Sequence, residues 1–413
     1  MSDQRDVVLI TVDSLRADHC GFMGYDRDTT PTIDELAASG LVFENAISPA
    51  PETNSAVATF LTGHYSNPHL ESDISTYTER TRQHMRIRRT VQQQFKEMGY
   101  TTAAVTANPW TSRYFDFDLD FDHFEDTMDD NLSKGLVEGG SDRGIVRDAV
   151  AQLLNWWQGQ DMFMSWESLY GEIQRTLESL ESPYFLWIFL VDVHMPYLPG
   201  KRRRTHSRLI TYPANLSLFV GKYDLPFQSL FHDVLIRSYD DAIRYTDDFV
   251  ARFLNDLDDD PLLVITSDHG ECFGEDGLYG HGPAISEEAL HVPFVVTNGP
   301  TGRVDQPFTL RQLPEFLTTL AKNEPYESVF RPIVYGRNYD PAIVVRGNRW
   351  RYEWRPTETI LETRTSETDQ WDSATVPKLE ELGQELVDSF VESERERGRI
   401  HTAAKATVAD ASL

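Results

Sequence analysis

Three residues of types that bind divalent cations follow two apolar runs in this chain. Asp13 comes directly after residues 6–12 (DVVLITV), and Asp268 and His269 follow residues 261–266 (PLLVIT) after a single serine. Carboxylate and imidazole groups are common cation ligands, and Gly270 allows the sharp turn by which adjacent Asp and His side chains reach one ion. An Asp after a strand is also a common cap, so Asp13 alone fits either role. Together the three residues predict a metal site that lacks one ligand.

Thr53 lies in the segment PETNSAVATFLTG, residues 51–63, which joins a Pro/Ala-rich loop to the first turns of a predicted helix. Threonine is common just before a helix, because its hydroxyl can accept a hydrogen bond from an unpaired backbone N–H. The local sequence therefore leaves two roles open for Thr53, a helix cap and a nucleophile.

The elements that must position these residues alternate along the chain. Amphipathic stretches at 32–39, 90–98 and 235–257 predict helices, because apolar residues return at helical spacing. Alternating strands and helices predict an α/β fold with a large, mostly parallel sheet between helices, and ligands bind such sheets at the carboxyl ends of the strands. The predicted buried strands are 6–12, 101–106, 184–193, 261–266 and 292–297.

The pattern of predicted strands and helices changes near residue 338, which predicts a main domain and a smaller C-terminal subdomain. Residues 1–337 form the main α/β domain, with an insertion at 126–182 whose aromatic residues either face a helix core or cover a substrate pocket or a membrane. Residues 338–398 read as a small C-terminal α+β subdomain, with a hairpin turning at Gly347-Asn348 and a helix from Pro377 to Val391. Residues 399–413 are expected to be a disordered tail.

Composition narrows the function classes. Charged residues make up 25% of the chain, the net charge is −28, and only 7 of the 38 cationic residues are Lys, which indicates either a salt-adapted protein or an ordinary acidic one. This charge argues against a general nucleic-acid binder. No apolar run approaches the ~20 residues that span a bilayer, so no transmembrane segment is expected. Two cysteines, expected as buried thiols, and an N-terminus without a signal-peptide pattern predict a cytoplasmic protein.

Seven blocks, taken in order, resemble the sulfatase and alkaline phosphatase superfamily of metal-dependent hydrolases. In sulfatases the helix-start block opens with a Cys or Ser that is oxidised to formylglycine, and counting back from Thr62-Gly63 places Thr53 there. Thr cannot be converted, so the resemblance implies a direct nucleophile, as in Thr-type phosphatases, phosphodiesterases and phospholipid head-group transferases. The blocks are Asp13 with Arg16, 60–63, 99–102, 193–197, 239–247, 266–271 and 279–282.

The resemblance also implies a full ligand set and further site residues. Thr53 would join Asp13, Asp268 and His269 around one divalent cation, Ca²⁺, Mn²⁺, Mg²⁺ or Zn²⁺. His194 and His281 match positions that contact the sulfuryl or phosphoryl oxygens or protonate the leaving group. Either histidine could instead help Asp192 or Asp247 to hold a second cation, although Asp247 is expected to cap or pair within its helix.

Two further residues have paired interpretations. Asn108 either binds substrate or forms a turn before Pro109, and Arg16 either binds the anion or pairs with Asp18 or Asp13. The resemblance implies a basic residue four positions after the nucleophile, at the end of a Pro-Ser-Arg or Pro-Ser-His sequence, but this chain has Ser55-Ala56-Val57 there. His64 is a candidate to compensate for this loss, although the resemblance implies that it lies one or two helical turns too far along.

The predicted function is hydrolysis of a sulfate or phosphate ester through a covalent Thr53 intermediate. A head-group transferase acting on a glycan or lipid and a non-catalytic anion-binding homologue are the alternatives. Two basic segments, 80–89 and 201–208, either favour an extended anionic substrate, such as a sulfated or phosphorylated glycan or a lipid head group, or form solvated faces.

Overall fold

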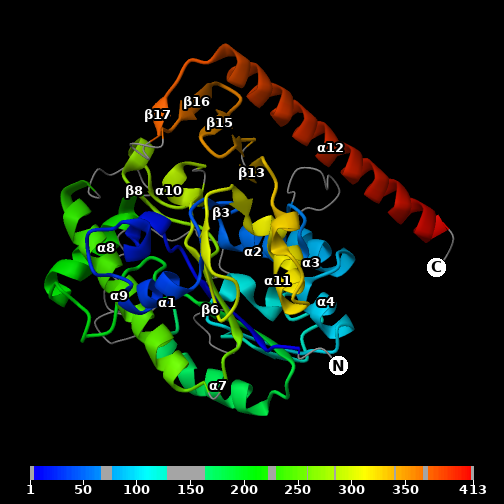
Figure 1. Cartoon of the computed structure of the whole chain (residues 1–413). Coiled ribbons are helices and arrows are strands. Elements are labelled where there is room, and N and C mark those ends of the chain that lie inside the picture. The colour runs from blue at the N-terminus through cyan, green and yellow to red at the C-terminus, as the bar shows by residue number, and fades with distance from the viewer. Residues whose placement is uncertain are drawn as a thin grey trace.

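The computed structural model describes residues 4–66, 77–127, 163–221, 229–257, 259–282, 285–338, 341–365 and 371–410. Its centre is an eight-stranded sheet (Figure 1). The strands of this sheet are β1 (Val7–Val12), β2 (Leu41–Phe43), β4 (Thr101–Thr106), β5 (His123–Glu125), β6 (Tyr184–Leu190), β7 (Leu262–Ser267), β10 (Phe294–Thr297) and β11 (Gly302–Val304). All five predicted strands are confirmed.

The sheet has the order β11-β2-β10-β7-β1-β6-β4-β5. β1 lies between β7 and β6 and is parallel to both, and β4 is parallel to β6 and β5. β10 runs antiparallel to β7 and β2. The sheet is therefore mixed but mostly parallel, as predicted, and its carboxyl edge gathers the residues that follow β1 and β7.

Both faces of the sheet are covered, which explains the nearly unbroken apolar runs. Along β1, Val8 and Ile10 pack into one core, whereas Val7 and Leu9 pack into the other. One face carries α1 (Pro31–Ser39), α7 (Trp166–Ser179), α8 (Arg208–Gly221) and α9 (His232–Asn255), and the other carries α2 (Thr53–Thr62), α3 (Tyr77–Ile87), α4 (Val91–Glu97) and α11 (Leu313–Ala321) (Figure 1).

The predicted insertion lies partly outside the described residues, because 128–162, including Trp156 and Trp157, are not among them. Its described end forms α7. Trp166 on this helix is buried against Tyr245 and Phe249, so this aromatic residue belongs to the helix core rather than to a pocket cover.

The C-terminal unit is a five-stranded antiparallel sheet with one long helix, α12 (Pro377–Asp410). Its strands are β13 (Val334–Arg337), β14 (Ile343–Arg346), β15 (Trp350–Trp354), β16 (Thr359–Thr363) and β17 (Asp372–Ser373). Arg346 pairs with Arg351 across the predicted turn at Gly347-Asn348, so the hairpin is confirmed. The sheet begins with β13, a few residues before 338.

The prediction of a disordered tail is wrong for residues 399–410, because α12 continues through them (Figure 1). Alanine is the strongest helix former, and the segment His401–Asp410 contains several alanines and no glycine or proline.

The remaining strands and the remaining α-helix of the described residues are short. They are β3 (Ala46–Ile47), β8 (Cys272–Phe273), β9 (Tyr279–Gly280), β12 (Phe308–Thr309) and α10 (Glu287–Leu290). Cys20 and Cys272 are both buried and unbridged, as predicted. Among the described residues, no helix has both the length and the apolar character needed to cross a membrane.

Candidate active site

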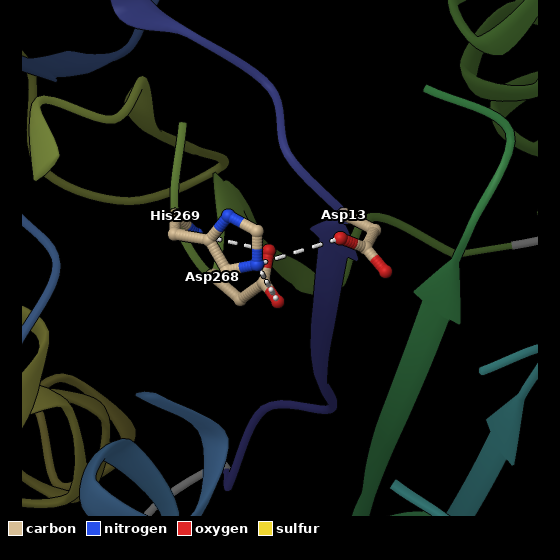
Figure 2. Close-up of side chains that lie close together, drawn as sticks. All are labelled: Asp13, Asp268 and His269. Carbon is tan, nitrogen blue, oxygen red and sulfur yellow. Dashed lines mark hydrogen bonds and ion pairs between the residues drawn. The ribbon is translucent and has the colours of Figure 1, made fainter. Parts of the chain in front are cut away.

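Two neighbouring parallel strands bring the predicted ligands together. Because Val12 pairs with Ser267 across β1 and β7, Asp13 and Asp268 leave the sheet side by side. One ligand atom from each of Asp13, Asp268 and His269 lies within 4.8 Å of the others, and all three side chains are fully buried. His269 Nε2 is 3.7 Å from Asp13 Oδ1 and 3.5 Å from Asp268 Oδ2 (Figure 2).

The carboxylates are held by hydrogen bonds from the surrounding chain. The Ser14 backbone N–H donates to Asp268 Oδ1 (3.1 Å), and the Ser14 hydroxyl donates to Asp13 Oδ1 (3.0 Å). Ser14 reaches both because its φ of 61° turns the chain sharply after β1, a conformation that is uncommon outside glycine. The Asn108 amide donates to Asp13 Oδ2.

Gly270 follows His269 for a different reason from the one expected. A Cβ at this position would lie 1.9 Å from the backbone carbonyl oxygen of Glu288. The Gly270 N–H donates to the carbonyl of Ala289 at 2.8 Å. Glycine therefore allows a close approach to α10, and this contact fixes the backbone that carries His269.

The hydrogen bonds of His269 determine which nitrogen is open. Its Nδ1 lies 2.8 Å from the carbonyl oxygen of Gly270, which can only accept, so Nδ1 carries the proton. Nε2 therefore presents a lone pair toward the two carboxylates. Burial lowers the pKa of His269 to about 4, so the ring is neutral at pH 7 and ready to bind a cation.

Thr53 completes the group and does not cap the helix. It is the first residue of α2, whose N-cap is Glu52. The Thr53 hydroxyl lies 3.2 Å from His269 Nε2 and donates to its lone pair. The structure thus excludes the helix-cap role of Thr53 and directs its hydroxyl at the candidate metal ligands.

His64 does not replace the missing basic residue. It follows the end of α2, roughly 16 Å along the helix axis from Thr53 at 1.5 Å per residue. Its charged neighbours are Arg88, Arg311 and Arg397. This position agrees with the expectation that His64 lies too far along.

The electrostatics of the buried group fit a divalent cation. Burial raises the pKa of Asp268 to about 7, and burial together with the neighbouring Asp268 raises the pKa of Asp13 well above its usual range. Asp268 Oδ2 accepts no well-aligned hydrogen bond from the described residues. Two carboxylates, a neutral imidazole nitrogen and a hydroxyl are a donor set that suits Ca²⁺, Mg²⁺, Mn²⁺ or Zn²⁺.

His281 and His194 extend the site as a row of imidazoles. The His269 and His281 ring centroids are 4.5 Å apart, and His281 Nε2 lies 3.0 Å from His194 Nε2. His194 Nδ1 donates to the carbonyl of Met195, so His194 Nε2 accepts and His281 Nε2 carries the shared proton. Burial lowers the pKa of His281 to about 3 and that of His194 well below its usual value. Both rings are neutral; His281 lies beside the candidate ligand His269, and His194 lies beyond His281 in the row.

Arg16 forms ion pairs within the chain, which is the second of the two roles predicted for it. Its guanidinium donates to Asp18 through Nε (2.8 Å) and Nη2 (2.7 Å), and Nη1 donates to Glu275 (2.8 Å). Nη1 also donates to the carbonyl of Glu271. These contacts match the predicted pairing with Asp18 and engage all three guanidinium nitrogens within the chain.

Asn108 combines its two interpretations in an unexpected way. Its Oδ1 accepts from the Trp110 N–H (2.7 Å) and caps a short 3₁₀ turn, whereas its Nδ2 donates to Asp13. The amide therefore positions a candidate metal ligand, and its predicted contact with substrate would need this bond to break.

The two carboxylates considered as ligands of a second cation, Asp192 and Asp247, instead accept hydrogen bonds at helix N-termini. Asp192 accepts from the Trp166 N–H at the start of α7, and Asp247 accepts from the N–H groups of Thr32 and Ile33 at the start of α1. Asp247 therefore caps a different helix from its own. Within the described part of the chain, one group of three metal-ligating side chains is found, the Asp13 group.

Sequence reasoning missed several residues that hold the site. The Ser267 hydroxyl donates to the carbonyl of His269 (2.6 Å) and accepts from the Leu15 N–H (2.9 Å). The Tyr239 hydroxyl donates to the carbonyl of Ser14 (2.6 Å) and accepts from the Arg16 N–H. Ser14 and Ser267 adjoin predicted ligands, which is a usable signal. Tyr239 lies on α9 and opens the block 239–247 of the family resemblance, but its role in holding the backbone after β1 was not predicted.

Comparisons with known proteins give this arrangement a family. The family model described as Sulfatase matches residues 5–320. The chain belongs to the sulfatase family. Human iduronate 2-sulfatase is 25% identical over 350 residues, which cover 71% of this chain and 60% of the human protein. Phosphatidylethanolamine transferase Mcr-2 of Escherichia coli is 41% identical over only 56 residues, 12% of this chain and 10% of that protein.

The fold is that of the alkaline phosphatase superfamily, as predicted. The solved phosphonate monoester hydrolase of Agrobacterium radiobacter superposes on this sulfatase-family chain with a TM-score of 0.63, at 15% identity over 95% of this chain and 96% of that one. The eight-stranded sheet and the small antiparallel C-terminal sheet are thus shared architecture.

Proposed function

We propose that this sulfatase-family chain is a metal-dependent hydrolase of sulfate or phosphate esters in which Thr53 forms the covalent intermediate. One observation carries the proposal. The Thr53 hydroxyl lies 3.2 Å from His269 Nε2, at the edge of a buried group of two carboxylates and one neutral imidazole.

Asp13, Asp268, His269 and Thr53 would hold the cation. When bound, a divalent cation lowers the pKa of a coordinated hydroxyl and polarises an oxygen of the anion. The chain supplies the remaining parts of the reaction. Thr53 presents its oxygen from the first turn of α2, whose backbone N–H groups favour a tetrahedral anion at that end of the helix.

The proposed reaction has two displacement steps. In the first, the Thr53 hydroxyl releases its proton to solvent, Thr53 Oγ1 forms a bond to sulfur or phosphorus, and the bond from that atom to the ester oxygen breaks. Binding of the anion raises the pKa of the neighbouring His281–His194 pair, so the pair takes up a proton from solvent and passes it to the departing alcohol. In the second step a water molecule attacks the same sulfur or phosphorus atom, the bond from that atom to Thr53 Oγ1 breaks, and a proton of the water restores the Thr53 hydroxyl as inorganic sulfate or phosphate leaves.

A head-group transferase is the second candidate. Two observations favour it, the threonine at the nucleophile position and the local similarity to a phosphatidylethanolamine transferase. In that reaction an alcohol of an acceptor glycan or lipid takes the place of water in the second step. Partition of the Thr53-bound group between water and an added alcohol separates the two functions.

The testing experiment is a substrate panel with a metal series. Purified protein is incubated with an aryl sulfate, a phosphate monoester and a phosphate diester, each with Mn²⁺, Ca²⁺, Mg²⁺ or Zn²⁺ and each with EDTA. We expect turnover of at least one ester class that EDTA abolishes, and a sulfuryl or phosphoryl adduct on Thr53 by mass spectrometry.

Two variants make the assignment specific. Thr53→Ala removes the hydroxyl and is expected to reduce turnover by at least about 10³-fold, whereas Thr53→Ser keeps it and should retain measurable activity. Equal activity in Thr53→Ala would refute the nucleophile. Absence of turnover with every metal and ester class would instead support a non-catalytic anion-binding homologue.

A further inference from the structure

The two basic segments of the sequence have different surroundings in the structure. In the first, Arg86 on α3 pairs with Asp116 (2.6 Å), and Arg82 on α3 donates to the carbonyl of Tyr114 (2.7 Å). Arg89, just after α3, pairs with Glu97 on α4. These arginines join α3 to neighbouring segments. The first basic segment is therefore explained by contacts within the chain.

The second segment, residues 201–208, lines a pocket. Lys201, Arg204 and Arg208 contribute to the wall of a cavity of about 200 Å³, which His194 also lines. Arg203 and Arg202 do not line this cavity, and Arg203 pairs with Asp248. We call this cavity the cationic pocket. It begins beside the imidazole row, because His194 is the residue common to both.

The charges in the cationic pocket favour an anion. Three cationic side chains face two carboxylates, Asp192 and Glu167. Asp192 shares the Trp166 N–H between its two oxygens and keeps its charge, so three cations against two carboxylates leave the pocket with a small net positive charge. Among the described residues, no carboxylate lies within ion-pair distance of Lys201 or Arg208. A locally positive pocket is unusual in a chain of net charge −28.

The apolar groups that line the cationic pocket suit a ring of the substrate. Phe163, Leu198 and Tyr245 supply apolar surface, and the Phe163 ring lies edge-on to His194 with centroids 5.0 Å apart. Pockets that bury a whole drug-sized ligand measure ~300–1,000 Å³. The smaller cationic pocket therefore suits one ring or one substituent of a substrate whose ester group lies beyond His194.

We propose that the cationic pocket binds a second anionic group, carried by the ring next to the scissile ester, through Lys201, Arg204 and Arg208. The preferred substrate is thus an ester whose alcohol part carries a carboxylate or a further sulfate or phosphate. The arginines provide planar donors that match these anions. Arg204 is positioned for this by its own bond to the carbonyl of Pro199 (2.8 Å). The inference rests on the proposed ester hydrolysis at Thr53.

The test compares two matched esters in matched variants. The 4-carboxyphenyl and 4-carbamoylphenyl esters, as sulfates and as phosphates, differ in charge but little in size. In Arg204→Met and Arg208→Met we expect KM for the carboxylate ester to rise about tenfold, the low end for a charge-assisted hydrogen bond, while kcat/KM for the carbamoyl ester stays within twofold. Arg202→Met, in the same loop but outside the pocket, is the control and should change neither ester.

Binding without turnover separates this proposal from the proposed reaction. On Thr53→Ala protein, isothermal titration with 4-carboxybenzenesulfonate and 4-carbamoylbenzenesulfonate, which cannot be hydrolysed, should show about tenfold tighter binding of the carboxylate, lost in Arg208→Met. Equal binding of the two sulfonates, or an equal loss for both esters in the pocket variants, would overturn the second-anion site. Failure of catalysis with the binding difference intact would refute only the hydrolysis.

Discussion

Replacing Asp268 with asparagine separates metal binding from folding at the buried site. Asparagine keeps the oxygen that accepts from the Ser14 and His269 N–H groups, and its amide nitrogen takes the place of Oδ2, which lacks a well-aligned partner. The amide can donate to the Thr53 hydroxyl or to His269 Nε2. The substitution therefore removes one buried negative charge with little change in shape.

The size of the effect follows from the pKa of Asp268. In the metal-free protein this pKa is raised from 3.8 to about 7, and one unit corresponds to about 1.4 kcal/mol. Ionised Asp268 thus opposes folding by on the order of 2–4 kcal/mol at pH 8. The cost is absent below about pH 4, where the carboxyl is protonated in both states. It grows as pH rises from 4 to 7, because the unfolded chain releases this proton first, and it is complete above pH 7.

We therefore expect Asp268→Asn to be more stable than the parent protein at pH 8 in EDTA, and to lose more than half of this advantage at pH 5. Urea unfolding at both pH values, in the same salt, measures the difference. Asp240→Asn is the control of opposite sign, because Arg27 and His19 pair with Asp240 and lower its pKa, so its ionisation stabilises the fold. A variant Asp268→Asn that is less stable than the parent protein at pH 8 in EDTA would refute the account of a repulsive, metal-ready site.

Three further outcomes follow from the same structure. Adding a saturating divalent cation should raise the melting temperature of the parent protein in proportion to the logarithm of metal concentration but leave Asp268→Asn nearly unchanged, which differential scanning fluorimetry would show. Asn108→Ala should weaken metal affinity about 10–100-fold, because it removes the donor that orients Asp13, and calorimetric titration that finds unchanged affinity would contradict this role. Gly383→Ala, although favourable for helix propensity, should destabilise the protein by about 1–3 kcal/mol in urea, since the new Cβ would lie 2.3 Å from Tyr352 on β15; a gain in stability would mean that α12 does not pack as described.

Much of the site could be predicted from the sequence alone, because each metal-ligating residue follows an apolar run that had to be a buried strand. Asp13 and Asp268 are 255 residues apart in number, yet parallel strands end at the same edge of a sheet, so their meeting needed only that β1 and β7 be neighbours. The hairpin at Gly347-Asn348 was readable for a similar reason, since its determinants are local.

The tertiary structure decided which atoms each side chain faces. Thr53 has the same sequence neighbours whether it caps α2 or faces His269, and only the packing of α2 against the sheet directs its hydroxyl at Nε2. Asn108 hydrogen-bonds to Asp13 across a separation of 95 residues, and Arg16 forms ion pairs with Asp18 and Glu275. Local patterns report burial and backbone conformation, whereas the partner of a buried polar group depends on which other segments the fold brings within hydrogen-bonding distance.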